Sequence, residues 1–168
     1  MTKKVERNYL EIFSIQDLRI NHDIELDNTI TLLEPSDFQI NKFFYKNVGK
    51  NHRWIDRLSW DNLKWASYLD NNNVLTYVLK LNDELIGYFE TIQDLPNKSS
   101  EIAYFGILKD FIGNKFGGYL LSEAIKKCFE LNCNKVWVHT CTLDHEHALK
   151  NYIDRGMKIF KQETINLI

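Results

Sequence analysis

A glycine-rich segment between a predicted strand and a predicted helix sets the strongest limit on how this chain can fold. The segment FIGNKFGGYLLSEAIKKCFEL (111–131) places Gly113, Gly117 and Gly118 within six positions, although the 168 residues contain only seven glycines. Glycine permits tight turns and lets a ligand approach the backbone closely. The first turn of a helix has unpaired N–H groups and carries the positive end of the helix dipole, so the segment predicts an anion-binding site.

The segments around this loop predict a mixed α/β fold. Residues 74–81 and 84–92 form a hairpin pattern rich in β-branched and aromatic residues, and EIAYFGIL (101–108) is a third strand directly before the loop. After the loop, apolar residues recur at helical spacing. The remaining predictions are strands at 9–14, 29–34, 135–140 and 157–165, and helices from Pro35 to about Tyr45, at 63–69 and from Asp144 to Arg155. The predicted order is β-β-α-α-β-β-β-α-β-α-β, with the glycine loop on a strand-to-helix crossover.

Length and composition argue against several classes of protein. The 168 residues fit one domain, and 44% hydrophobic with 26% charged residues is an ordinary globular composition. A net charge of −2 provides no basic field for nucleic acid, and no apolar run is long enough to span a membrane. The three cysteines are an odd number in one region and do not suggest a disulfide framework. Since the N-terminus also lacks the pattern of a secretory signal, we expect a cytoplasmic protein with no nucleic-acid or membrane partner.

Two other glycine-rich phosphate loops fit the segment poorly. A P-loop requires GxxxxGK[ST], but Gly118 is followed by Tyr119 and Leu120, so the lysine and the Mg²⁺-binding hydroxyl are missing. A dinucleotide fingerprint requires GxGxxG early in a βαβ unit, whereas the glycines here follow another spacing late in the chain. The alternative without a ligand is that the glycines only permit a tight turn and close packing of the helix.

Two segments resemble the GNAT superfamily of N-acyltransferases. EIAYFGILKDFIGNKFGGYLLSEAI (101–125) is similar to its acetyl-CoA-binding core, in which a strand leads into a loop of the type [RQ]xxGx[GA] and then a helix. Ile112 and Lys115 depart from that loop pattern. DHEHALKNYIDRGMKIF (144–160) resembles the later motif NxxAxxxYxxxGF, and the preceding HTCTLDH is typical of one subgroup.

The resemblance implies both a fold and an activity. The implied fold is α/β (α+β), with a mostly antiparallel sheet of about six to seven strands and about four helices, splayed between the strands at 101–108 and 135–140. It also implies one acyl-CoA N-acyltransferase domain over 1–168, with the acceptor side at about 1–70 and the cofactor-binding core at about 74–161. The expected reaction transfers an acetyl group from acetyl-CoA to a primary amine by direct attack in a ternary complex. The alternatives are a catalytically weak acyl-CoA-binding module and a structural, partner-binding domain; a homodimer is possible.

The cofactor would lie along the strand and the glycine loop. Consecutive N–H groups of residues 113–118 would bind the pyrophosphate, and Lys115 would add a charged contact. The pantetheine amides would pair with the strand before the loop. The predicted cofactor-binding residues are Phe105, Gly106, Ile107, Leu108, Gly113, Asn114, Lys115, Phe116, Gly117, Gly118, His145 and Asn151.

The predicted catalytic residues would carry out two proton transfers. An amine attacks a thioester only when it is neutral, so a group must accept its proton. The resemblance assigns this role of general base to Glu101, and Glu90 on the neighbouring strand is the second candidate. The resemblance assigns Tyr152 the role of general acid toward the departing thiolate. The alternatives are an exposed carboxylate at a strand end for Glu101 and an ordinary core aromatic for Tyr152.

The acceptor is expected to contact the segment YKNVGKNHRWIDRLSW (45–60). Trp54 and Arg57 are the predicted contacts, with the arginine positioned to bind a carboxylate, and Glu90 is the third predicted substrate-binding residue. The alternative is that the tryptophans pack between helices and the charges are solvated. The cluster HTCTLDHEH contains residues that could bind a metal, but it lacks a CxxC or HExxH element, so no metal site is predicted. Cys141 is expected to be a small buried residue; a role as acyl-carrying nucleophile is the less favoured alternative.

Overall fold

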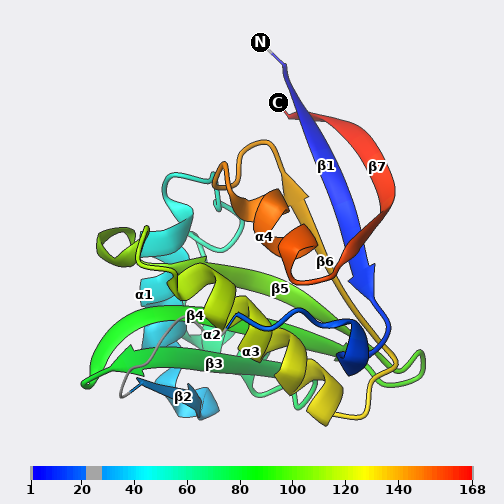
Figure 1. The fold of residues 1–168 in the computed structure, drawn as a ribbon. Coiled ribbons are helices and arrows are strands. Elements are labelled where there is room, and N and C mark those ends of the chain that lie inside the picture. Colours follow the sequence, from blue (N-terminus) through cyan, green and yellow to red (C-terminus); the bar gives the residue numbers. More distant parts are fainter. Residues whose placement is uncertain (1, 22–27, 168) are drawn as a thin grey trace.

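The computed structural model describes residues 2–21 and 28–167 and contains the predicted elements in the predicted order (Figure 1). Short 3₁₀ helices at Ile15–Asp17, Pro35–Asp37 and Lys109–Phe111 join some of them. The strands are β1 (Lys3–Ile12), β2 (Asn28–Leu32), β3 (Val74–Leu81), β4 (Glu84–Asp94), β5 (Ser99–Ile107), β6 (Lys135–Cys141) and β7 (Lys158–Leu167). The helices are α1 (Phe38–Gly49), α2 (Asn62–Leu69), α3 (Phe116–Glu130) and α4 (Ala148–Asp154).

The seven strands form one sheet in the order β2-β3-β4-β5-β6-β1-β7. Neighbouring strands run antiparallel except β5 and β6, which are parallel. These two strands pair only from Ser99–Lys135 to Glu101–Trp137 and then diverge (Figure 1). The predicted mostly antiparallel sheet and its splay between β5 and β6 are therefore confirmed.

The first strand is longer than predicted and lies far from the second. The sequence pattern indicated a strand over 9–14, but β1 begins at Lys3 and ends at Ile12. It pairs with β6 on one side and β7 on the other, so the two ends of the chain lie together (Figure 1). Val5, Leu10 and Ile12 are almost completely buried in this position, and burial of apolar side chains is the main stabilising contribution to such a placement.

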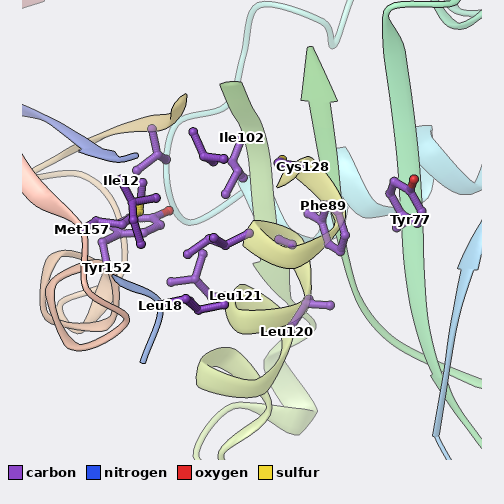
Figure 2. Packing of buried hydrophobic residues seen from close by; sticks show 14 of the residues in the cluster. Ile12, Leu18, Tyr77, Phe89, Ile102, Leu120, Leu121, Cys128, Tyr152 and Met157 are labelled. Atoms are coloured by element: carbon purple, nitrogen blue, oxygen red, sulfur yellow. The ribbon is translucent and has the colours of Figure 1, made fainter. Parts of the chain in front are cut away.

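The sheet has a helical layer on each face. α3 covers one face, where Leu120, Leu121 and Ile125 are completely buried. The core on that side extends from Tyr77 and Phe89 to Tyr152, which lies beside Ile12 and Met157 (Figure 2). α1 and α2 pack on the opposite face over β3 to β5 through two further apolar clusters (Figure 1). The strands β6, β1 and β7 form the remaining part of that face.

Two helix boundaries differ from the predictions. The helix predicted from Pro35 to about Tyr45 begins at Phe38 and continues to Gly49. The helix predicted from Asp144 to Arg155 spans only Ala148–Asp154. Asp144 instead accepts hydrogen bonds from the Thr140 hydroxyl (2.5 Å) and the Cys141 N–H (2.9 Å), which hold the preceding residues in a turn. An aspartate that bonds nearby backbone in this way competes with helix formation.

Candidate active site

A cavity of about 1130 Å³ occupies the region where β5 and β6 diverge. One side is formed by the glycine loop, the N-terminus of α3, and α4. The other side is formed by the loop between α1 and α2 and by the ends of β1 and β7. We call these the cofactor side and the acceptor side.

The N-terminus of α3 opens onto the cofactor side without a side-chain cap. Lys115, at the N-cap, has a left-handed backbone (φ 65°), and Gly113 turns the chain with φ 91°. A Cβ on Gly117 would meet only the Asn151 amide nitrogen, at 3.7 Å, and one on Gly113 would meet nothing within 4 Å. The backbone N–H groups of this turn are therefore accessible to an anion.

Gly118 has closer neighbours than Gly117. A Cβ at this position would lie 2.4 Å from the Arg155 Nη1 and 2.4 Å from the side-chain nitrogen of Asn21. Both atoms are the ends of flexible side chains, so a side chain at this position would displace Arg155 and Asn21. Gly117 is the glycine that leaves the helix N-terminus open to the cavity.

Arg155 is a cofactor-side cation that the sequence analysis missed. Its Nε is buried and has no hydrogen-bond partner among the described residues, while Nη1 donates a long hydrogen bond to Asn151 Oδ1 (3.4 Å). It lines the cavity beside the N-terminus of α3. A lone arginine before Gly156 carries no signal in the sequence, because only the packing of α4 on α3 brings it to the loop.

The predicted cofactor residues divide into two groups. Asn151 donates a hydrogen bond to the Gly117 carbonyl oxygen (3.1 Å), which joins α4 to α3. Three predicted residues do not line the cavity: Leu108 donates its N–H to Ile86, Asn114 bonds to the Phe111 carbonyl, and Phe116 is buried in the core. The other nine line it, namely Phe105, Gly106, Ile107, Gly113, Lys115, Gly117, Gly118, His145 and Asn151.

Tyr152 brings a protonated phenol to the cavity from α4. The side chain is only 7% exposed and packs beside Ile12 and Met157 (Figure 2). No hydrogen bond joins its hydroxyl to a described residue, although the residue lines the cavity. Burial raises the pKa of Tyr152 well above its ordinary value, and the nearby Asp144 raises it further. The phenol therefore stays protonated at neutral pH and is available as a hydrogen-bond donor.

Glu101 lies at the last paired position before β5 and β6 separate. It lines the cavity and is half-buried. Burial raises the pKa of its carboxyl group, and the negative charge of Glu90 raises it further. A bulge in the β4–β5 ladder follows, since Thr91 pairs with Ile102 and Glu90 with Tyr104, which leaves Ala103 unpaired at the cavity.

Arg57 lines the cavity but forms a buried ion pair with Glu90, so its guanidinium is already engaged and its contact with an acceptor stays a prediction. Arg57 is 7% exposed and Glu90 is 1% exposed, and both guanidinium nitrogens lie 3.0 Å from the carboxylate oxygens. Tyr68 donates to the same carboxylate at 2.6 Å. Glu90 does not line the cavity, and its charge is already balanced by Arg57. Glu101 is consequently the available carboxylate of the two candidates for the base.

Aromatic rings enclose the Arg57 guanidinium. Its carbon lies 4.2 Å from the centre of the Tyr104 ring, 4.3 Å from that of Tyr68 and 4.8 Å from that of Trp60. Such stacking suits the weakly hydrated, planar guanidinium. The ion pair therefore anchors the segment 45–60 to β4 and the sheet beneath it.

The anchored segment forms one wall of the acceptor side. Trp54 is half-buried, packs edge-on against Tyr104 at 5.0 Å and lines the cavity. His52 makes a hydrogen bond through Nδ1 to the Leu143 carbonyl oxygen (3.1 Å), which joins this wall to the loop between β6 and α4.

The opposite wall contains residues that no sequence pattern indicated. Val5 and Arg7 of β1, and Ile165 and Leu167 of β7, line the cavity. The chain ends reach the site only because β1 lies between β6 and β7. A local pattern cannot report this pairing, since its partners are more than 120 residues apart.

The described residues include no group suited to a metal. Among residues 2–21 and 28–167, no three His, Cys, Asp or Glu side chains are placed to hold a metal ion, and this includes the segment HTCTLDHEH. In the same part of the chain, no helix has the length and apolar character needed to cross a membrane.

The sequence matches the family described as Acetyltransferase (GNAT) family over residues 37–157. No curated protein matches it.

Solved structures with similar folds include several acetyltransferases. A GCN5-related N-acetyltransferase from Sphaerobacter thermophilus has a TM-score of 0.71 at 15% identity, over 98% of this chain and 53% of its own. The aminoglycoside acetyltransferase meta-AAC0020, from an uncultured soil metagenomic sample, has a TM-score of 0.64 at 17% identity, over 76% of this chain and 86% of its own. An IAA acetyltransferase from Bacillus cereus has a TM-score of 0.59 at 21% identity, over 80% of this chain and 79% of its own. This chain spans 61% of a functionally unknown conserved protein from Staphylococcus epidermidis (TM-score 0.66, 14% identity). At these identities the likeness shows a shared fold.

Proposed function

Because the chain belongs to the GNAT acetyltransferase family and is thus an acyltransferase, we propose that it transfers an acetyl group from acetyl-CoA to a primary amine. In this proposal the amine attacks the thioester directly in a ternary complex, and residues 1–168 act as one acyltransferase domain. The cytoplasmic location and the possible homodimer stay predictions.

The cofactor side fits the anionic part of coenzyme A. The uncapped first turn of α3 presents backbone N–H groups, and Gly117 leaves room for a phosphate to approach them. Lys115 and Arg155 line the same side of the cavity and add two positive charges. These features support pyrophosphate binding at residues 113–118.

Glu101 and Tyr152 would divide the proton transfers. Glu101 would accept a proton from the attacking amine, directly or through water, since a carboxylate with a raised pKa is a stronger base than an exposed one. The new bond joins the amine nitrogen to the acetyl carbon, and the bond from that carbon to sulfur breaks. Tyr152 would donate a hydrogen bond to the departing thiolate. The observation that carries the proposal is this pair of residues, which bring a base and a donor to one cavity from different elements.

Acetyl-CoA binding and thiol release test the proposal. We expect calorimetry to detect acetyl-CoA binding and a thiol-release assay to detect turnover with primary amines. Gly117→Val should abolish binding, because its side chain fills the approach to the helix N-terminus, while the thermal unfolding midpoint stays near that of the parent. Gly117→Ala is the matched control and should weaken binding less.

Two results would contradict the proposal. Unchanged acetyl-CoA affinity in a folded Gly117→Val variant would overturn the assigned phosphate site. Tight acetyl-CoA binding without thiol release for any amine would favour the catalytically weak binding module instead.

A further inference from the structure

The acceptor side contains a cation with unused hydrogen-bonding capacity. The Nε of Arg7 is buried and has no hydrogen-bond partner among the described residues. Its Nη1 makes only a long contact to the Tyr9 hydroxyl (3.5 Å) and lies 3.8 Å from Glu163. A well-formed charged hydrogen bond is about 2.7–2.9 Å long, so neither contact satisfies the guanidinium. Arg7 lines the cavity, and a ligand can therefore reach it.

Glu163 does not neutralise Arg7 because other groups use the same carboxylate. The Tyr9 hydroxyl donates to its Oε1 at 2.5 Å, and Lys161 lies 3.4 Å from its Oε2. Two cations thus share one carboxylate, and the cluster of Arg7, Tyr9, Lys161 and Glu163 retains positive charge. An anion that enters the cavity would supply the missing partner.

The strand registers place Arg7 and Glu101 on the same face of the sheet. Arg7 pairs with Cys141, and Glu101 pairs with Trp137, four residues earlier on β6. Alternate residues of a strand share a face, so Trp137 and Cys141 lie on the same face of the sheet. Their pairing partners Glu101 and Arg7 lie on that face as well. At about 3.3 Å per residue along β6 and two strand spacings across the sheet, the Cα atoms of Arg7 and Glu101 lie about 16 Å apart. Side chains on one face stand roughly perpendicular to the sheet, so the charged ends of Arg7 and Glu101 are separated by a distance of the same order.

The surface near Arg7 is apolar. Val5, Ile165 and Leu167 line the cavity from the ends of β1 and β7, and Val5 pairs with Ile165 across the two strands. These side chains offer no partner for a polar or charged chain. The strand registers place these residues beyond Arg7 as seen from Glu101, so they border the Arg7 end of the site.

We infer that Arg7 binds an anionic group of the acceptor, which is an amine that carries a carboxylate at the far end of a spacer. The inference rests on the proposed function, because it assumes that the amine lies near Glu101. The carboxylate would accept hydrogen bonds from the Arg7 guanidinium, including the unpartnered Nε. An α-amino acid, whose charged groups are adjacent, is too short for this arrangement.

The test compares amines that differ only in the carboxylate. We use 6-aminohexanoate and 8-aminooctanoate against hexylamine and octylamine, with glycine as the short acceptor, and measure KM and kcat by thiol release. We expect the two longer amino acids to have a KM about tenfold to a hundredfold lower than the matched amines. Arg7→Gln should remove this difference and leave kcat and acetyl-CoA affinity nearly unchanged. Arg7→Lys should restore part of it, since the charge remains.

Lys158→Gln is the matched control because it removes an exposed cation of the same strand, β7, that does not line the cavity. It should preserve the preference for the carboxylate. Equal KM for the amino acids and the amines in the parent protein would overturn the inference while the proposed function stands.

A binding measurement keeps the inference testable without turnover. Calorimetry of 8-aminooctanoate with the protein saturated with coenzyme A should show affinity that Arg7→Gln reduces at least tenfold. If thiol release fails for every amine but this loss occurs, the proposed function is wrong and the anion site stands. Identical affinity in the parent and Arg7→Gln would overturn the anion site.

Discussion

Tyr152→Phe is the substitution that isolates the proposed donor most cleanly. Phenylalanine keeps the ring that packs beside Ile12 and Met157, so no cavity is created in the core (Figure 2). The hydroxyl has no hydrogen-bond partner among the described residues, so its removal breaks no internal bond. The free energy of unfolding should therefore change by less than about 0.5 kcal/mol, the usual range for a substitution that disturbs no buried contact. An effect on catalysis would then arise from the chemistry.

The size of the catalytic effect follows from the pKa of the phenol. Burial raises the pKa of Tyr152 above its ordinary value of 10.0, whereas a thiol ordinarily has a pKa of about 8.5. Complete proton transfer from phenol to thiolate is thus uphill, and we expect Tyr152 to stabilise the thiolate by a hydrogen bond. A hydrogen bond to a charged group contributes about 1.5–3 kcal/mol. Since about 1.4 kcal/mol corresponds to a factor of ten, kcat should fall about 10- to 150-fold.

The assay is steady-state thiol release with a fixed amine, together with calorimetry of acetyl-CoA. Tyr77→Phe is the matched control, since Tyr77 is another buried tyrosine, stacked on Phe89 in the same core, but does not line the cavity. It should leave kcat unchanged. A Tyr152→Phe variant with kcat within about threefold of the parent would refute the role of the hydroxyl. A fall in acetyl-CoA affinity equal to the fall in activity would instead indicate a binding role.

Two further predictions concern carboxylates. Because burial raises the pKa of Glu101 and a base must be deprotonated, the acidic limb of kcat/KM should lie above the ordinary pH range of a glutamate. Glu101→Gln should remove that limb when the acceptor is a weakly basic amine, and an unchanged limb would exclude Glu101 as the base. Arg57→Met should lower the free energy of unfolding by about 3–5 kcal/mol, since it leaves the Glu90 charge buried without its partner. Denaturant unfolding should then show that Arg57→Met with Glu90→Met costs less than the sum of the single variants; strict additivity would contradict the coupling.

The sequence by itself determined the order of the elements and the position of the glycine loop. These features depend on local patterns, namely alternation in strands, helical spacing of apolar residues and glycine where a left-handed turn or a close approach is needed. Tyr152 could also be proposed as a catalytic residue in advance, because its motif lies within one short segment. Even here, Asp144 overrode the predicted start of α4 by bonding to the end of β6.

Only the tertiary structure decided which distant side chains meet at the cavity. Arg57 looked like a free acceptor ligand in its loop, but the fold places it against Glu90, and a buried charge without a partner would cost several kcal/mol. Arg155 reaches the glycine loop because α4 packs on α3. Arg7 reaches the acceptor side because β1 pairs with both β6 and β7. Long-range pairing of this kind depends on the burial of apolar surface over the whole sheet, and a local stretch of sequence does not encode it.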